Sequence, residues 1–404
     1  MAAATRRLAV LRRRDFRLLL AGQSISVFGD RMVVVALAFA VLEVGGSASA
    51  VGLVIAAGVA PMVGCVLIGG VVADRISRRA VMVVADLVRV ASQATMAALL
   101  IAGSPELWML ALLAAVTGSA TGFFGPALSG LIPEIVPPDE LQPANALRST
   151  GFSLGEILGP LTAGLIVAAA GAGWAIAVDA GTFAMSAACL AILRVSARAD
   201  QPERKSFFRD LREGWGAFRA RRWVWTFVIY FAIANTLWGA WAALGPVVAD
   251  RDLGGAAAWG TVLAAFGVGA LAGSLLATWA VPRRPLVLVA LSEALFALPL
   301  AFLAAAAPVP VLAVGTFLSG AGMMFGMSVW EATLQGHIPR EWLSRVTSYD
   351  WFGSFAFYPV GLAIWGPIAG VIGIGPALWV AFALFIASVA SLVALPDVRG
   401  LRTP

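Results

Sequence analysis

Long apolar stretches alternate with short polar segments from about residue 17 to the end of the chain. A helix needs about 20 apolar residues to cross the hydrocarbon core of a bilayer. Some of the stretches are rich in glycine and proline, which spanning helices tolerate. The sequence therefore predicts an all-α membrane protein with twelve transmembrane helices. Their expected bounds are 17–42, 50–73, 80–102, 107–130, 144–170, 173–194, 224–249, 258–281, 285–306, 309–332, 345–371 and 375–395.

The overall composition points to the same environment. Of the 404 residues, 60% are hydrophobic and only 12% are charged, whereas a soluble domain carries about 25% charged residues. Too few charges are present to cover a water-facing surface of this size. Lipid is the solvent that suits the apolar excess.

Positive charges fall almost entirely on one side of the predicted helices. The opposite side holds only Arg251, which is flanked by Asp250 and Asp252. Short loops rich in Lys and Arg stay in the cytoplasm, so both termini are expected to be cytoplasmic. The net charge of +6 then reflects membrane orientation, and no nucleic-acid partner is expected. The basic side carries Arg6, Arg7, Arg12, Arg13, Arg14, Arg17, Arg75, Arg78, Arg79, the run 194–222, Arg283, Arg284, Arg340, Arg399 and Arg402.

The chain divides into two similar halves. Segments that match at a constant offset of 202 residues include 136–141 with 338–343, and Gly159 with Gly361. We expect an N-terminal six-helix bundle over 1–194, a cytoplasmic linker over 195–223, and a C-terminal six-helix bundle over 224–404. The linker is expected either to form an amphipathic helix at the membrane surface or to be a solvated connection. Its apolar stripe would consist of Phe208, Leu211, Trp215 and Phe218.

A charged motif follows the second predicted span. It consists of Gly70, Asp74, Arg75, Arg78 and Arg79. Asp74 at a helix end can accept hydrogen bonds from a neighbouring helix N-terminus, and the arginines can pair between the halves or with anionic lipid. The motif resembles the signature Gly-x-x-x-Asp-Arg-x-Gly-Arg-Arg of the major facilitator superfamily, with Ser77 in place of the usual glycine. The resemblance implies two pseudo-symmetric six-helix bundles and a conformational-switch role for these residues.

The fifth predicted span carries a second motif, Gly155, Gly159, Pro160 and Gly164. Small residues four apart allow helices to approach closely, and proline bends a helix. The motif is similar to one found in antiporters of drug-exporting branches, although close helix packing alone also explains it. With the phrases at 27–30, 132–137 and 178–180, it resembles the drug:proton antiporter-3 branch, which includes macrolide-efflux and enterobactin-exporter-like proteins.

Two acidic residues are predicted near the middle of spans. Asp30 lies in the first span and Glu156 in the fifth. An ionisable side chain at this depth is costly unless it is paired or hydrated, and a buried carboxyl group takes up a proton readily. Both are therefore proton-coupling candidates, or else members of fixed ion pairs, for example Asp30 with Arg31. The resemblance places both spans beside a central cavity, with Gln23, Ser26, Asn235, Trp238 and Trp241 as substrate-cavity candidates.

Other intramembrane charges have more local explanations. Asp86 and Arg89 are spaced i, i+3 and can pair with each other. Arg148 and Asp350 occupy equivalent offsets in the two halves and are candidates for a latch that closes the cytoplasmic side. Asp179 and Glu293 lie in spans that the resemblance makes peripheral, and a structural or interfacial role is expected for both.

The expected function is secondary transport. We expect export of a small amphipathic molecule such as a drug, macrolide or siderophore, by alternating access and proton antiport. Uptake of a solute or movement of a lipid by the same fold are alternatives. A membrane-embedded enzyme such as an acyltransferase would require clustered His, Asp or Lys, and it is disfavoured because the chain has one histidine and one lysine, Lys205. No cofactor, metal or catalytic residue is expected. The expected partners are the substrate, protons and membrane lipid, and the expected state is a monomer in the cell membrane.

Overall fold

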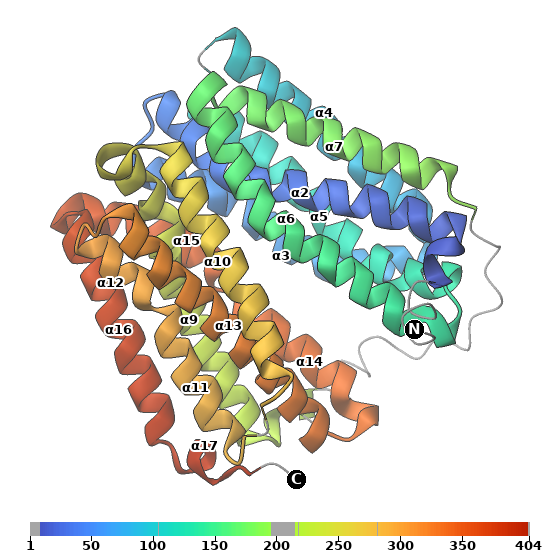
Figure 1. Cartoon of the computed structure of the whole chain (residues 1–404), viewed down its shortest axis with the longest axis vertical. Coiled ribbons are helices and arrows are strands. Elements are labelled where there is room, and N and C mark those ends of the chain that lie inside the picture. Colours follow the sequence, from blue (N-terminus) through green and yellow to red (C-terminus); the bar gives the residue numbers. More distant parts are fainter. Residues whose placement is uncertain (1–8, 104, 195–214, 217, 281, 403–404) are drawn as a thin grey trace. The chain divides into compact units, whose positions relative to one another are not determined.

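The structure, a computed structural model, describes residues 9–103, 105–194, 215–216, 218–280 and 282–402, and this part of the chain contains helices and no strand. Figure 1 traces the helices in chain order. In the first half they are η1 (Ala9–Arg12), α2 (Arg14–Glu43), α3 (Ala48–Arg75), α4 (Arg78–Ala102), α5 (Leu107–Ile135), η2 (Pro138–Glu140), α6 (Leu141–Ala170) and α7 (Ala172–Ile192).

The second half continues the same architecture. Its elements are α9 (Arg222–Val248), η3 (Ala249–Leu253), α10 (Ala256–Ala277), α11 (Pro285–Phe296), α12 (Leu298–Ala304), α13 (Val309–His337), α14 (Arg340–Phe355), α15 (Tyr358–Ile372), α16 (Ile374–Ala394) and α17 (Pro396–Gly400). Among the described residues, 12 helical segments are long and apolar enough to cross a membrane. The predicted all-α class and number of spans are confirmed.

Two predicted spans are each divided into a pair of helices. The ninth consists of α11 and α12, and the eleventh of α14 and α15. Pro299 and Pro359 lie in the first turns of α12 and α15. Proline has no backbone N–H and cannot continue the hydrogen bonding of a preceding helix, which explains both interruptions.

The described helices belong to two compact units. Unit 1 comprises Met1–Ala197 and Ala249–Ala264, and unit 2 comprises Arg198–Val248 and Ala265–Pro404. Within unit 1, α2 packs against α6 and α7, α3 packs against α5, and α4 packs against α5 and α7. Buried apolar side chains such as Phe16, Met82, Phe124 and Leu190 form its core. Within unit 2, α9 packs against α14, α15 and α16, and α11 packs against α13.

The internal repeat extends to backbone geometry. Gly171 separates α6 from α7 with φ 90° and ψ 164°, and Gly373 separates α15 from α16 with φ 90° and ψ 156°. The two glycines are again 202 residues apart. A positive φ favours glycine because it has no Cβ. Both glycine N–H groups donate to the helix that ends there, at Val167 and Ala369, which are also 202 residues apart.

A side chain of α2 caps the turn at Gly171. The backbone N–H of Ala172 donates to Glu43 Oε1 at 2.9 Å. The first N–H groups of a helix have no partner within the helix, and a carboxylate there also interacts favourably with the helix dipole. Glu43 therefore joins the end of α2 to the start of α7.

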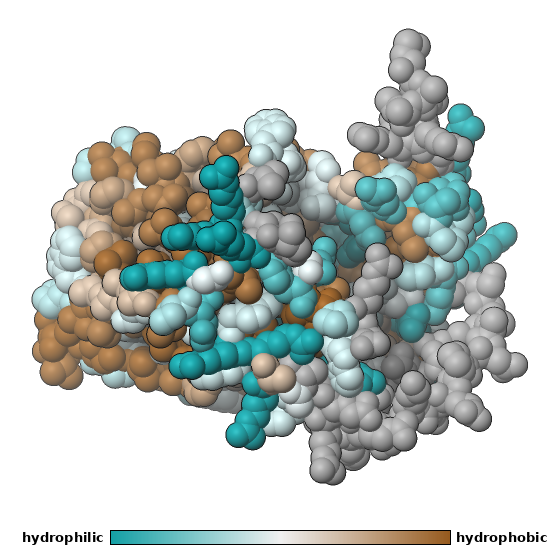
Figure 2. Space-filling view, turned by 90° about the horizontal axis from the view of Figure 1, so that it is seen from below, coloured by the Kyte–Doolittle hydropathy of each residue, from teal (hydrophilic) through white to brown (hydrophobic). Residues whose placement is uncertain are grey.

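Hydrophilic side chains gather on the face shown in Figure 2, whereas apolar side chains cover much of the neighbouring surface. Arg222 and Asp397 form an exposed ion pair in unit 2, with 3.1 Å between Nε and Oδ2. The linker helix predicted over 195–223 falls largely on residues outside the described part of the chain. Two of its described residues, Trp215 and Phe218, pack against Tyr349 with ring centroids 5.5 and 5.6 Å apart.

Candidate functional site

A group of charged and polar side chains lies inside unit 1 where α2, α4 and α7 meet. Asp86 Oδ1 is 2.7 Å from Arg89 Nη2, which confirms the predicted i, i+3 pair. Asp30 Oδ2 of α2 is 3.9 Å from Arg89 Nη1. Asp179 of α7 interacts electrostatically with both Asp30 and Arg89. We call Asp30, Asp86, Arg89, Gln93 and Asp179 the unit 1 charge cluster.

Arg89 is held at the centre of this cluster by two aromatic rings. Its guanidinium carbon lies 4.3 Å from the ring centroid of Phe124 on α5 and 4.4 Å from that of Phe183 on α7. The side chain is only 2% exposed. Cation–π contacts are strongest when the cation is removed from water. Arg89 is therefore fixed between α5 and α7 and points its charge at the acids.

Asp179 is completely buried but has polar partners. Gln93 Nε2 of α4 donates to Asp179 Oδ2 at 2.7 Å. Thr182 Oγ1 lies 2.7 Å from the Asp179 carbonyl oxygen and 3.3 Å from Asp179 Oδ1. The sequence did not predict that Asp179 lies close enough to Asp30 for the two acids to interact.

The spacing of polar residues along α4 and α7 predicts part of this arrangement. Positions 86, 89 and 93 on α4, and positions 179, 182 and 186 on α7, share the spacing i, i+3, i+7 that places residues on one helix face. A polar stripe on a spanning helix requires a polar neighbour. The register between helices, which decides which stripes meet, is not encoded in either stripe alone.

The two predicted proton-coupling residues occupy different surroundings. Asp30 retains 38% of its side-chain surface exposed although it lies beside the buried Arg89. Glu156 of α6 pairs with Arg31 of α2, with 2.8 Å between Oε1 and Nη2. Arg31 also lies over the ring of Phe152, 4.9 Å from its centroid. The structure thus pairs Arg31 with Glu156 and places Asp30 nearest to Arg89.

The other polar candidates of α2 point into unit 1. Gln23 and Ser26 are both buried, and Gln23 Nε2 has no hydrogen-bond partner in the described part of the chain. They share this buried face of α2 with Gly22 and Gly29, which pack against α7. In this structure Asp30, and not Gln23 or Ser26, is the accessible polar side chain of that group.

The aromatic candidates of α9 differ in accessibility. Trp238 is half-buried and stacks on Phe296 of α11, with ring centroids 4.0 Å apart, and on Trp241 at 5.5 Å. Trp241 itself is only 3% exposed. Asn235 donates through Nδ2 to the carbonyl oxygens of Phe231 and Ser354, at 2.9 and 3.1 Å. Trp238 therefore offers the accessible ring of this group.

The two latch candidates each have a partner in their own unit. Asp350 is buried, and Trp330 Nε1 donates to its Oδ2 at 2.9 Å. Ser354 Oγ lies 3.5 Å from Asp350 Oδ1. Arg148 donates through Nη1 to Asn145 Oδ1 at 3.2 Å, one turn earlier in α6.

The charged motif after α3 connects helices within unit 1. Arg78 Nη1 donates to the Gly130 carbonyl at 2.5 Å and to Glu134 Oε1 at 2.9 Å, both at the end of α5. Arg79 donates to the carbonyls of Leu190 and Ala191 at the end of α7, the first at 2.9 Å. Cations at helix C-termini are favourable. Gly70 has open space where a Cβ would be, Arg75 is exposed, and the side chain of Asp74 lies outside the described residues.

The glycines of the fifth-span motif bring helices into close contact. A Cβ at Gly155 would lie 2.8 Å from Val27 Cγ1 of α2, and one at Gly159 would lie 2.8 Å from the Phe28 carbonyl oxygen. Pro160 is buried in the same helix. Gly164 faces the start of α10, where a Cβ would lie 2.5 Å from the Ala256 carbonyl oxygen. The motif therefore acts at least as a close-packing device.

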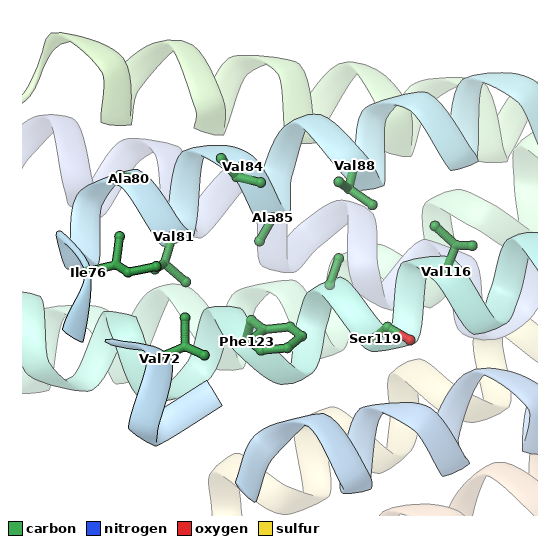
Figure 3. Close-up of a pocket in the computed structure, with 11 residues that line it drawn as sticks. Val72, Ile76, Ala80, Val81, Val84, Ala85, Val88, Val116, Ser119 and Phe123 are labelled. Carbon is green, nitrogen blue, oxygen red and sulfur yellow. The ribbon is translucent and has the colours of Figure 1, made fainter. Parts of the chain in front are cut away.

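An apolar pocket of about 480 Å³ lies on α3, α4 and α5 of unit 1, away from the candidates above. Figure 3 shows Val84 and Val88 of α4 on one side and Val116 and Phe123 of α5 on the other. Its lining contains no charged residue. Such a surface suits hydrocarbon.

Twelve helical segments of spanning length among the described residues, together with an internal repeat and buried ionisable groups, define a multi-pass membrane protein of the transporter class. A family model described as Major Facilitator Superfamily matches residues 19–356. The chain therefore belongs to the Major Facilitator Superfamily, as its motifs predicted.

Characterised relatives cover most of the chain. The multidrug efflux pump Tap of Mycolicibacterium fortuitum is 27% identical over 86% of this chain and 87% of its own length. Macrolide efflux protein A of Streptococcus pyogenes is 23% identical over 88% of this chain and 89% of its own length.

Solved structures show the same fold. The nucleoside transporter NupG matches with a TM-score of 0.77 at 12% identity, covering 94% of this chain and 98% of that chain. A POT family transporter in complex with 5-aminolevulinic acid matches with a TM-score of 0.75 at 12% identity, covering 96% and 97%. Identity this low supports the shared architecture alone.

Proposed function

We propose that this chain is a secondary active transporter that exports a small amphipathic molecule in exchange for protons, and that it has no enzymatic activity. The relatives named for multidrug and macrolide efflux support the substrate class and the direction. The observation that carries the coupling mechanism is the position of Asp30, an accessible carboxylate beside the buried Arg89 in the middle of a spanning helix.

Asp30 and Glu156 are the proposed proton-coupling residues. A charged side chain at the centre of a bilayer costs about 2.5–3.5 kcal/mol or more unless it is paired or hydrated. Each acid has an arginine within 4 Å, Arg89 for Asp30 and Arg31 for Glu156. Protonation weakens such an attraction and frees the arginine. A change in helix packing can therefore follow proton binding at either acid.

The half-buried Trp238, with Asn235 beside it, is the proposed contact for substrate in unit 2. Aromatic rings bury large apolar areas without requiring a fixed partner. A weakly charged amphipathic molecule suits this surface better than a sugar or an ion. Gln23, Ser26 and Trp241 would contribute only if the helices rotate, because all three are buried in the described state.

Alternating access would tilt the two six-helix bundles against each other. In this proposal Gly70, Asp74, Arg75, Arg78 and Arg79 form the conformational switch, and Arg148 and Asp350 form the latch. Because Asp350 already accepts from Trp330, latch formation would require an exchange of that hydrogen bond. We further propose cytoplasmic termini and a monomer that contacts anionic lipid.

Reconstitution into liposomes tests this function. A panel of macrolides, other amphipathic antibiotics and aryl siderophores is assayed for counterflow and for accumulation inside acid-loaded vesicles. One substrate class should accumulate only with the pH gradient, and Asp30→Asn and Glu156→Gln should each reduce that accumulation while a matched exposed change, Asp252→Asn, should not. Gradient-driven accumulation that is unchanged in both Asp30→Asn and Glu156→Gln would reject the assigned coupling residues.

A further inference from the structure

The unit 1 charge cluster has an unbalanced charge. It contains three carboxyl groups, on Asp30, Asp86 and Asp179, and one guanidinium, on Arg89. Arginine stays protonated in proteins. With every acid ionised the cluster would carry two surplus negative charges, and Asp86, Arg89 and Asp179 are almost completely buried. Buried charges without compensation are avoided by neutralisation, so the cluster has to take up a proton.

A further cation, Arg31 of α2, interacts electrostatically with Asp30 and forms an ion pair with Glu156 of α6. The pair of Arg31 and Glu156 is neutral overall, so it does not compensate the surplus charge of the cluster. The side chain that α5 presents to Arg89 is Phe124, which is uncharged. From α7 the cluster receives Thr182 and Ser186, which are hydroxyls, besides Asp179. The surplus is therefore internal to Asp30, Asp86 and Asp179.

Unused hydrogen-bonding capacity accompanies the surplus charge. Both Asp86 carboxylate oxygens, and Nε and Nη2 of Arg89, are buried without a hydrogen bond in the described part of the chain. The short Asp86–Arg89 contact is thus an ion pair without hydrogen-bond alignment. Such atoms usually have a partner. The Asp86 oxygens therefore lack a donor and the Arg89 N–H groups lack an acceptor, so the charges of this pair are only partly compensated.

The contacts of Asp179 indicate which acid takes up the proton. Asp30 and Asp86 each lie within 4 Å of an Arg89 nitrogen, whereas Asp179 has no ion pair within that distance in the described part of the chain. Its carboxylate oxygens instead accept from neutral donors, Oδ2 from Gln93 Nε2 at 2.7 Å and Oδ1 from Thr182 Oγ1 at 3.3 Å. A buried carboxyl group without a cation within reach is neutralised most readily.

Asp30 is the acid of the cluster that retains exposed side-chain surface, 38% of the total. Its neighbour Gly29 lies directly against α7, so closely that a Cβ there would overlap Asp179 Oδ1 and Thr182 Oγ1. This contact holds the backbone next to Asp30 against the Asp179 carboxyl group.

We propose that the unit 1 charge cluster is a proton-binding site in which the Asp179 carboxyl group holds the proton and Asp30 exchanges it with water. The step transfers one proton from Asp179 to the Asp30 carboxylate, and then from Asp30 to water, without any redox change. The coupling role of this site rests on the proposed proton antiport. Asp179 is thereby assigned a role in proton coupling in addition to its structural contacts.

Infrared spectroscopy of the full-length protein in lipid nanodiscs tests the proton site without transport. At neutral pH the wild type should show the C=O stretches of protonated carboxyl groups, and the difference spectrum between the wild type and Asp179→Asn should contain one such band, assigned to Asp179. Asp252→Asn, an equivalent change at an exposed acid, should keep that band. An unchanged band in Asp179→Asn would overturn the proposal. Asparagine can accept from Gln93 and donate to Thr182, so this variant preserves the local contacts.

Gln93→Leu keeps the test decisive if Asp179→Asn does not fold. Removing the donor to Asp179 Oδ2 should shift the band while leaving it present. A band at the wild-type position in Gln93→Leu would also overturn the assignment. In Asp30→Asn the band should remain, but its decay after a jump to alkaline pH should be slower than in the wild type. Unchanged decay would exclude Asp30 as the exchange point.

Vesicle transport distinguishes this inference from the proposed function. With one proton per cycle, a pH gradient of about one unit supports about tenfold accumulation. Asp179→Asn should lose this accumulation and retain counterflow. Full accumulation in Asp179→Asn would overturn the coupling role of Asp179 and leave antiport standing. If the wild type binds the proton but shows no gradient-driven accumulation, antiport fails and the proton site stands.

Discussion

Equivalent groups of three helices in the two units enclose different side chains. In unit 1, α2, α4 and α7 enclose three acids and an arginine. In unit 2, α9, α11 and α16 are their counterparts in the internal repeat, and they enclose Tyr230, Glu293 and Phe385. Tyr230 donates to Glu293 Oε2 at 3.4 Å, and its ring lies 6.4 Å from that of Phe385. Equivalent helices thus enclose a charged cluster in unit 1 and, in unit 2, a cluster formed by Tyr230, Glu293 and Phe385.

The two units illustrate two ways in which a buried carboxyl group can be stabilised. Glu293 has a neutral hydroxyl donor and aromatic surroundings, so it can remain protonated without an arginine. The unit 1 acids surround Arg89 and can exist in more than one charge state. Proton exchange is therefore expected in unit 1, whereas unit 2 offers an aromatic cluster in which the half-buried Trp238 stacks on Phe296.

Replacement of Arg89 should have the largest effect. Arg89→Ala removes the positive charge and both cation–π contacts and leaves the acids unpaired, and loss of one partner of a buried ion pair costs about 3–5 kcal/mol. Thermal unfolding in detergent should show a strong loss of stability that acidic pH partly reverses, because protonation removes the acids' charge. As a control, Arg222→Ala breaks a pair whose arginine is 72% exposed and should cost less than about 1 kcal/mol. Equal losses of stability in the two variants would contradict the proposal that the Arg89 charge stabilises unit 1.

Gly29→Ala should have an intermediate effect. The added methyl group would meet Asp179 Oδ1 and Thr182 Oγ1 on α7, and overpacking of a close contact costs about 1–3 kcal/mol. The unfolding temperature should fall, and gradient-driven accumulation should fall more than counterflow. Gly181→Ala on α7 is the matched control because open space surrounds that glycine. It should be neutral or slightly stabilising, since alanine favours a helix.

The sequence was sufficient for some of these features and not for others. Apolar length predicted the spans, and the i, i+3 spacing predicted the Asp86–Arg89 pair, because both depend on a single helix. The meeting of Asp30 with Arg89, and of Gln93 with Asp179, depends on the register between helices. Glycine contacts such as Gly29 with α7 set this register. The sequence offered Arg31 as one possible partner for Asp30, whereas the ion pair that Arg31 forms in the structure is with Glu156 of another helix.

Tyr230→Phe in unit 2 should have the smallest effect. It removes the hydroxyl that donates to Glu293 and preserves the ring, and interhelical hydrogen bonds in membranes contribute about 0.6 kcal/mol on average. Unfolding should therefore occur within a few degrees of the wild type, and pH-gradient-driven accumulation should be intact. The companion change Glu293→Gln should also retain accumulation, in contrast to Asp179→Asn, because a glutamine amide can replace a carboxyl group that stays neutral. If Glu293→Gln lost accumulation while Asp179→Asn kept it, proton exchange would take place at Glu293 in unit 2. The assignment of roles to the two units would then be reversed.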